Sequence, residues 1–114
     1  MIGVQFAEFE REVVFLTLER YPKISELLSW QFNQAQVNKR VFSKHGFYTE
    51  FIVLPSAVRL AERGELILEG PFLRINDIKE KARFSLRVRN GFLYFLEGRL
   101  SLEEWPRIIE YYGL

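Results

Sequence analysis

The chain has 114 residues, of which 48% are hydrophobic and 16% aromatic, and its formal net charge is +1. This length suits one core, so we expect residues 1–114 to form a single α+β domain. The absence of cysteine and the presence of one histidine exclude disulfides, thiol catalysis and cysteine-ligated zinc, and we expect no metal and no cofactor. The small net charge argues against a long nucleic-acid footprint.

The sequence predicts no membrane segment. No apolar run approaches the roughly 20 residues that a membrane-spanning helix needs. Glu8, Glu10 and Glu12 lie where a signal peptide would carry its apolar region. We therefore expect a cytoplasmic protein that does not bind a membrane.

Two amphipathic helices are expected first. Residues 4–20 carry apolar side chains at three- and four-residue spacing, and Tyr21-Pro22 ends the pattern because the residue before proline avoids the α region. A second apolar stripe covers residues 24–35. Trp30 falls off this stripe, and two interpretations stay open: the ring packs against a loop, or it contacts a partner protein.

The remainder predicts an antiparallel sheet built from two hairpins. Residues 36–54 indicate one hairpin, with Gly46 expected in a left-handed turn position. Residues 78–89 then alternate between apolar and mainly basic side chains, which is typical of a strand with one buried face. Asn90-Gly91 predicts a type I′ turn, and residues 92–96 return as its second strand.

The two-residue turn also predicts the register of the second hairpin. Leu86 is expected opposite Phe95 on the core face, and the same count places Glu97 on that face. A buried carboxylate needs a partner, for which we expect Arg40 or, second, Lys39. Such an ion pair would be a structural anchor or the floor of a ligand site, and a solvated Glu97 at a frayed strand end is the remaining alternative.

The outward face of this hairpin gathers arginines and rings. Basic residues interleaved with aromatics on a sheet can bind single-stranded nucleic acid, but they can also stack on one another in solvent. The expected interaction surface comprises Trp30, Arg83, Arg87, Arg89, Phe92 and Tyr94.

The end of the chain predicts a short helix. Ser101 and Glu104 match a capping box, and Pro106 suits a first helical position, so a C-terminal helix is expected to close an edge of the sheet. His45 lies in a predicted turn, and no sequence spacing gives it a catalytic partner. We therefore predict no catalytic residue.

Two segments resemble a known family. Lys39-Arg40 followed by Gly46-Phe47-Tyr48-Thr49-Glu50-Phe51 resembles the segment "RE-x-TG-x-GF-[FY]-T-x-F" of an uncharacterised family of small bacterial α+β proteins. Asn90-Gly91-x-Leu93-x-x-Leu96-Glu97-Gly98 and Glu104-Trp105-Pro106 resemble that family's "DG-x-L-x-x-LEG…E-x-WP" ending. Val41 replaces the family's usual glutamate. The resemblance implies an α+β fold and no particular reaction.

We thus expect an α+β protein with two N-terminal helices on one face of the sheet. The leading functional hypothesis is a non-enzymatic protein-interaction module of immunity or regulatory type, which binds a partner protein or a second copy of itself. The first alternative is single-stranded nucleic-acid binding through the arginine-rich face. The second is an enzyme whose site combines carboxylates and basic residues distant in sequence.

Overall fold

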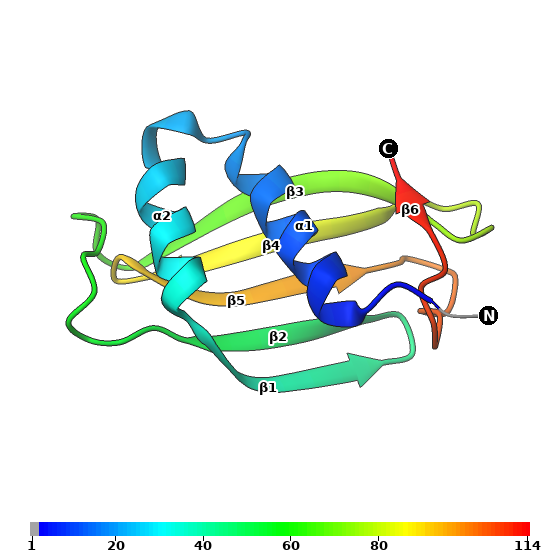
Figure 1. Ribbon diagram of the computed structural model, residues 1–114. Helices are drawn as coiled ribbons and strands as arrows, with labels where there is room; N and C mark the ends of the chain where they lie inside the picture. The colour runs from blue at the N-terminus through cyan, green and yellow to red at the C-terminus, as the bar shows by residue number, and fades with distance from the viewer. Residues whose placement is uncertain (1–2) are drawn as a thin grey trace.

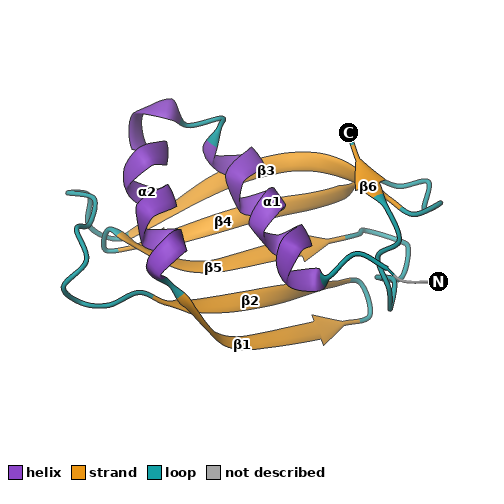
Figure 2. Ribbon diagram, in the orientation of Figure 1, coloured by secondary structure: helices purple, strands orange, loops and turns teal. Residues whose placement is uncertain are grey.

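The computed structural model describes residues 3–114 and shows two helices packed on one face of a six-stranded antiparallel sheet (Figures 1 and 2). The helices come first in the chain, and the strand order in the sheet is β1-β2-β5-β4-β3-β6. The expected α+β class is confirmed. The elements are α1 (Phe6–Leu18), α2 (Pro22–Gln34), β1 (Gln36–Ser43), β2 (Gly46–Ile52), β3 (Glu65–Ile75), β4 (Ala82–Arg89), β5 (Phe92–Arg99) and β6 (Tyr112–Gly113).

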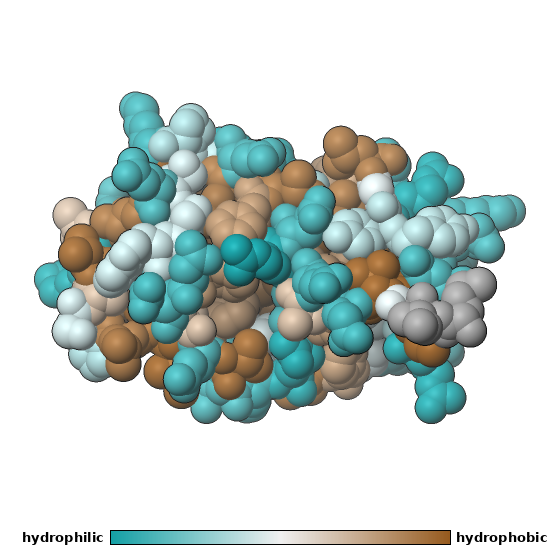
Figure 3. Space-filling view, in the orientation of Figure 1, coloured by the Kyte–Doolittle hydropathy of each residue, from teal (hydrophilic) through white to brown (hydrophobic). Residues whose placement is uncertain are grey.

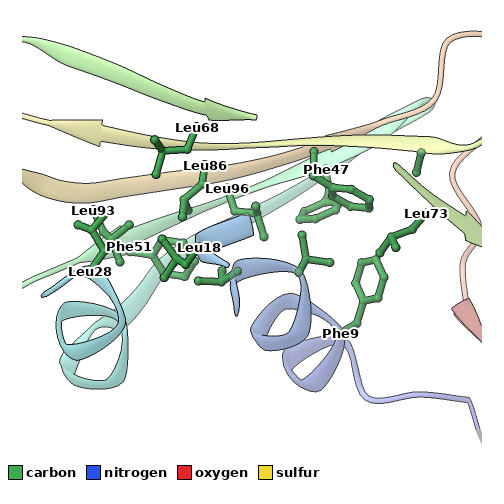
Figure 4. Close-up of a cluster of buried hydrophobic side chains, with 14 of the residues drawn as sticks. Phe9, Leu18, Leu28, Phe47, Phe51, Leu68, Leu73, Leu86, Leu93 and Leu96 are labelled. Carbon is green, nitrogen blue, oxygen red and sulfur yellow. The ribbon is translucent and has the colours of Figure 1, made fainter. Parts of the chain in front are cut away.

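The core lies between the helices and the sheet. Phe9 and Leu18 of α1 and Leu28 of α2 point toward the strands and are at most 1% exposed (Figure 4). The ring of Trp105 is also buried, and its centroid lies 5.1 Å from that of Phe47. The amphipathic stripes that predicted both helices are therefore the faces that bury this core.

The first hairpin forms as expected, but Gly46 has a different role. It does not adopt a positive φ among the described residues; only Gly64 and Gly91 do so among the glycines. A Cβ on Gly46 would lie 2.1 Å from the carbonyl oxygen of Gly98, so glycine allows β2 to approach β5 closely.

The second hairpin has the predicted turn but a shifted register. Asn90 and Gly91 have φ angles of 50° and 84°, as a type I′ turn requires. Val88 pairs with Leu93 as expected. Beyond this pair, the register between β4 and β5 shifts by one residue because β5 contains a β-bulge. The slip reverses the faces of the residues that follow on β5.

Because of the bulge, Glu97 does not lie on the predicted face of the sheet. Beyond it, Leu96 rather than Phe95 pairs with Leu86 and is buried. Glu97 pairs with Ser85 and lies on the outer face of the sheet, whereas the prediction placed it in the core. The prediction failed because it assumed an unbroken alternation after the turn.

The predicted C-terminal helix is wrong, since residues 100–111 are irregular and end in the short strand β6. The backbone groups of this segment bind other parts of the chain. The N–H of Leu100 donates to the carbonyl of His45, and that of Trp105 donates to Lys44. The side-chain carboxylate of Glu80 accepts hydrogen bonds from the N–H groups of Ser101, Leu102 and Glu103. These long-range partners replace the bonds of a helix.

Candidate functional site: the outer sheet face and the helix-side ion pair

The outer face of the sheet is not covered by the two helices, which both pack on the other side (Figure 2). Alternation along the strands brings basic, acidic and aromatic side chains to this face. Its charged members are interspersed rather than segregated by sign. They include Lys39, Glu50, Glu65, Glu69, Arg83, Arg87, Arg89, Glu97 and Arg99.

Arginines of β4 lie over rings of the neighbouring strands. The guanidinium carbon of Arg89 lies 3.9 Å from the ring centroid of Tyr94, and that of Arg87 lies 5.1 Å from Phe95. The two rings contact each other edge to face at 4.9 Å, because the bulge brings both to the outer side. Such cation–π contacts contribute about 0.5–1 kcal/mol at exposed sites.

The same arginines are partly neutralised. Arg87 Nη1 lies 3.2 Å from a carboxylate oxygen of Glu65, and Arg89 Nη2 lies 4.0 Å from the other. Arg83 stacks over Phe72 of β3 at 5.4 Å. The structure therefore brings the predicted arginines together, but each already has an aromatic or acidic neighbour.

Glu97 lines a hollow of about 210 Å³ on the outer face. Arg83, Arg87 and Arg99 line the same hollow. Within residues 3–114, no ion pair or hydrogen bond holds the Glu97 side chain. The expected pair between Glu97 and Arg40 does not form, because the two residues lie on opposite faces of the sheet.

The remaining predicted surface residues are dispersed. Phe92 lies beside Arg59 of the connection between β2 and β3, whose guanidinium carbon is 5.8 Å from the ring centroid. Trp30 is 49% exposed and lines a hollow on α2 together with Val58 of that connection. Lys39 lies on the outer face, where its ammonium group is 5.9 Å from the ring of Tyr48.

Arg40 binds a carboxylate that sequence reasoning missed. Its side chain lies on the helix side and donates two hydrogen bonds to Glu10 of α1, at 2.8 Å and 2.5 Å. Glu10 also accepts a hydrogen bond from the hydroxyl of Thr49 on β2, and both Glu10 and Thr49 are buried. The only signal in the sequence was an acidic residue next to Phe9 in the apolar stripe of the helix.

The Glu10–Arg40–Thr49 cluster is suited to structural support rather than catalysis. The hydrogen bond to Glu10 raises the pKa of Arg40 against the opposing effect of partial burial, so the cluster holds a fixed charge pair. Both carboxylate oxygens of Glu10 are occupied by donors. A groove of about 360 Å³ beside the pair is lined in part by Phe32, Val37 and Arg40.

His45 contacts the backbone of the C-terminal segment. His45 Nδ1 lies 2.9 Å from the backbone carbonyl of Glu103, which orients the ring toward the main chain. In the described part of the chain, no cluster of three or more acidic or histidine side chains could hold a metal ion. Neither of the helices described within residues 3–114 is long and apolar enough to span a membrane.

Comparisons of the chain with protein-family models, with curated proteins and with solved structures found no match.

Proposed function

We propose that the protein is a non-enzymatic interaction module, of regulatory or immunity type, that binds a partner protein through the outer face of its sheet. The observation that carries this proposal is the set of arginine–aromatic stacks on a face that no helix covers. Arginine and aromatic residues are enriched at protein interfaces and at their energetic centres. Side chains already ordered by stacking on a sheet lose little conformational entropy when a partner binds.

The charge pattern favours a protein partner over nucleic acid. A phosphate backbone would meet Glu65, Glu69 and Glu97 on the same face as the arginines. A base that stacked on Tyr94 would have to displace the guanidinium group of Arg89. A partner protein can instead present both carboxylates and cations in a matching order.

Two charge-matched double variants test the proposed surface. Arg83→Ser with Arg89→Ser removes two cations from the outer face, and Arg11→Ser with Lys23→Ser removes two from the exposed helical side. Wild-type and variant proteins are immobilised, exposed to lysate of the source cells, and compared by quantitative mass spectrometry. Calorimetry with the recovered partner then gives its affinity for each variant.

We expect the outer-face variant to lose at least about tenfold in affinity, or 1.4 kcal/mol. The helix-side variant should bind the partner like the wild type. A partner that binds both double variants equally well would contradict the proposed surface. Binding of short labelled single strands that weakens steeply between about 50 and 200 mM salt and is lost in the outer-face variant would favour the nucleic-acid alternative.

A further inference from the structure

The two edges of the sheet are protected unequally. At the β3 edge, the hydroxyl of Tyr21 accepts a hydrogen bond from the N–H of Glu69 at 2.8 Å, and Arg20 donates to the carbonyl of Gly70. Strand β6 also pairs with the end of β3. Strand β1, in contrast, pairs only with β2, and no described element lies along its other side. Uncovered edges of this kind pair readily with strands of another chain.

The hairpin decides which backbone groups of β1 are free. Ser43 and Gly46 flank a two-residue turn, and hydrogen-bonded and non-hydrogen-bonded pairs alternate along the strands from that point. Val41 therefore bonds to β2, whereas the N–H and C=O groups of Arg40 and Phe42 point toward the open edge. A strand that docks there must form its hydrogen-bonded pairs with these two residues.

Apolar side chains accompany the free backbone groups. Phe42 is 54% exposed, Val37 is 46% exposed and Val41 is 37% exposed, all within one eight-residue strand. Figure 3 shows hydrophobic residues between hydrophilic ones at the lower margin of the molecule, where β1 runs in Figure 1. Phe42 lies on the helix side, 5.1 Å from the ring of Phe6, and Val41 lies on the outer side opposite Tyr48. Apolar surface along an open edge is typical of an interface.

We propose that β1 pairs with β1 of a second copy, antiparallel and with Val41 on the two-fold axis. In this register Arg40 of each copy lies opposite Phe42 of the other. Arg40 and Phe42, whose backbone groups are free, then lie opposite each other across the two copies. The two Val41 side chains meet at a close, non-hydrogen-bonded position. The guanidinium of Arg40, which lies 5.2 Å from the ring of Phe6, also faces the second copy's Phe42 ring.

Charge selects this register from its neighbours. In an antiparallel pair, directly opposed residues have their side chains on the same face. A two-fold axis perpendicular to the sheet must therefore pass between one residue of β1 and the same residue of the second copy. An axis at Lys39 or Arg40 places that cation opposite itself, and an axis at Phe42 places Arg40 opposite Lys44. Like charges directly opposite each other are destabilising. The axis at Val41 avoids every such pair.

The dimer has one continuous sheet with the helices of both copies on the same side. The outer faces of the two copies become a single surface. Pairing at the edge of the sheet does not depend on the partner proposed for that outer face.

Sedimentation velocity over a concentration series tests the edge. We expect wild-type protein to shift from monomer to dimer as its concentration rises toward about 1 mM. Val41→Lys should remain monomeric because two ammonium groups meet on the axis, whereas Ile67→Lys, at an exposed apolar position on the outer face of β3, should dimerise like the wild type. A wild type that stays monomeric, or a dimer that survives Val41→Lys or is lost equally in Ile67→Lys, overturns the proposal.

Two further variants test the register. A mixture of Val41→Lys and Val41→Glu should form a heterodimer, since only this register brings position 41 opposite itself. The chain has no cysteine, so Val41→Cys places one thiol on the axis, where Cα atoms about 4.5 Å apart allow a disulfide. Mild oxidation should link Val41→Cys into a dimer and leave Ile67→Cys unlinked. The absence of both the heterodimer and the linked dimer, in variants whose circular dichroism is native, overturns the register.

Discussion

Arg40 of β1 holds Glu10 of α1 through two parallel hydrogen bonds, from Nε to Oε2 and from Nη2 to Oε1. Glu10 is 3% exposed and also accepts a hydrogen bond from Thr49 on the next strand. The carboxylate thus joins the first helix to the two strands at the open side of the sheet. A bidentate guanidinium contact fixes the orientation of these elements as well as their distance.

Removing the guanidinium should destabilise the fold. We expect Arg40→Ala to lower the free energy of unfolding by about 2–3 kcal/mol, because Glu10 is left buried without its charged partner. This loss lies below the roughly 3–5 kcal/mol of a fully buried pair, since Arg40 keeps some contact with solvent. Urea unfolding at low protein concentration measures the effect. Lys39→Ala, on the outer face, is the control and should change stability by less than about 0.5 kcal/mol. Equal losses in both variants would contradict the anchoring role of Arg40.

Gln31 should be a second buried polar anchor. Its side-chain Nε2 donates to the carbonyls of Val58 and Gly91 at 2.8 Å and 3.0 Å, and its Oε1 accepts from the N–H of Leu93 at 2.9 Å. Gln31→Leu removes the partner of the Val58 carbonyl and of the Leu93 N–H, so we expect a loss of about 1–3 kcal/mol in urea unfolding. The Gly91 carbonyl keeps the N–H of Leu60 as a donor. Gln34→Leu, at an exposed position of the same helix, should be nearly neutral. A neutral Gln31→Leu would show that these backbone groups find other partners.

Glu80 should titrate far below an ordinary glutamate. Hydrogen bonds from the backbone N–H groups of Leu102, Glu103 and Ser101 stabilise its charged form and lower its pKa from 4.5 to about 2. A carboxyl whose pKa is lower in the folded protein stabilises the fold above its ordinary pKa and loses this effect as the pH falls toward 2. Protection of these amides from hydrogen exchange should therefore persist at pH 4.5 and decline toward about pH 2.

Carbon-detected NMR titration of the Glu80 carboxyl gives its midpoint directly. Glu80→Gln should weaken amide protection in residues 101–103 at neutral pH, because an amide has only one acceptor oxygen. Glu104→Gln, at an exposed position nearby, should leave that protection unchanged. A Glu80 midpoint near 4.5 would mean that these hydrogen bonds are not maintained in solution.

The outer-face arginines should matter little for stability. Arg87 and Arg89 share the carboxylate of Glu65 at 3.2 Å and 4.0 Å and stack on half-buried rings. We expect Arg87→Ala with Arg89→Ala to lower the free energy of unfolding by about 1 kcal/mol or less, since exposed pairs of this kind contribute little. Thermal and urea unfolding measure the change. A loss of several kcal/mol would show that these side chains support the fold rather than a binding surface.

Local backbone chemistry made several elements predictable from the sequence. Asn90-Gly91 predicted its turn because these residues adopt positive φ angles at low cost, and both do so. The helices followed from apolar spacing, since one face of each had to meet the sheet. The outward-facing positions of Arg83, Arg87 and Arg89 also followed from alternation on β4, which the bulge does not interrupt.

Only the tertiary structure decided which residues meet. Phe95 and Leu96 are both apolar, so the sequence favoured neither for the core, and the bulge that selects Leu96 depends on packing against the helices and neighbouring strands. Glu10 and Arg40 are 30 residues apart, and no periodic pattern marks their contact. The C-terminal segment carries a helix-start pattern, but the Glu80 carboxylate takes its N–H groups. Local patterns report the preference of a segment, whereas the final hydrogen-bond partners depend on which distant groups the fold brings within reach.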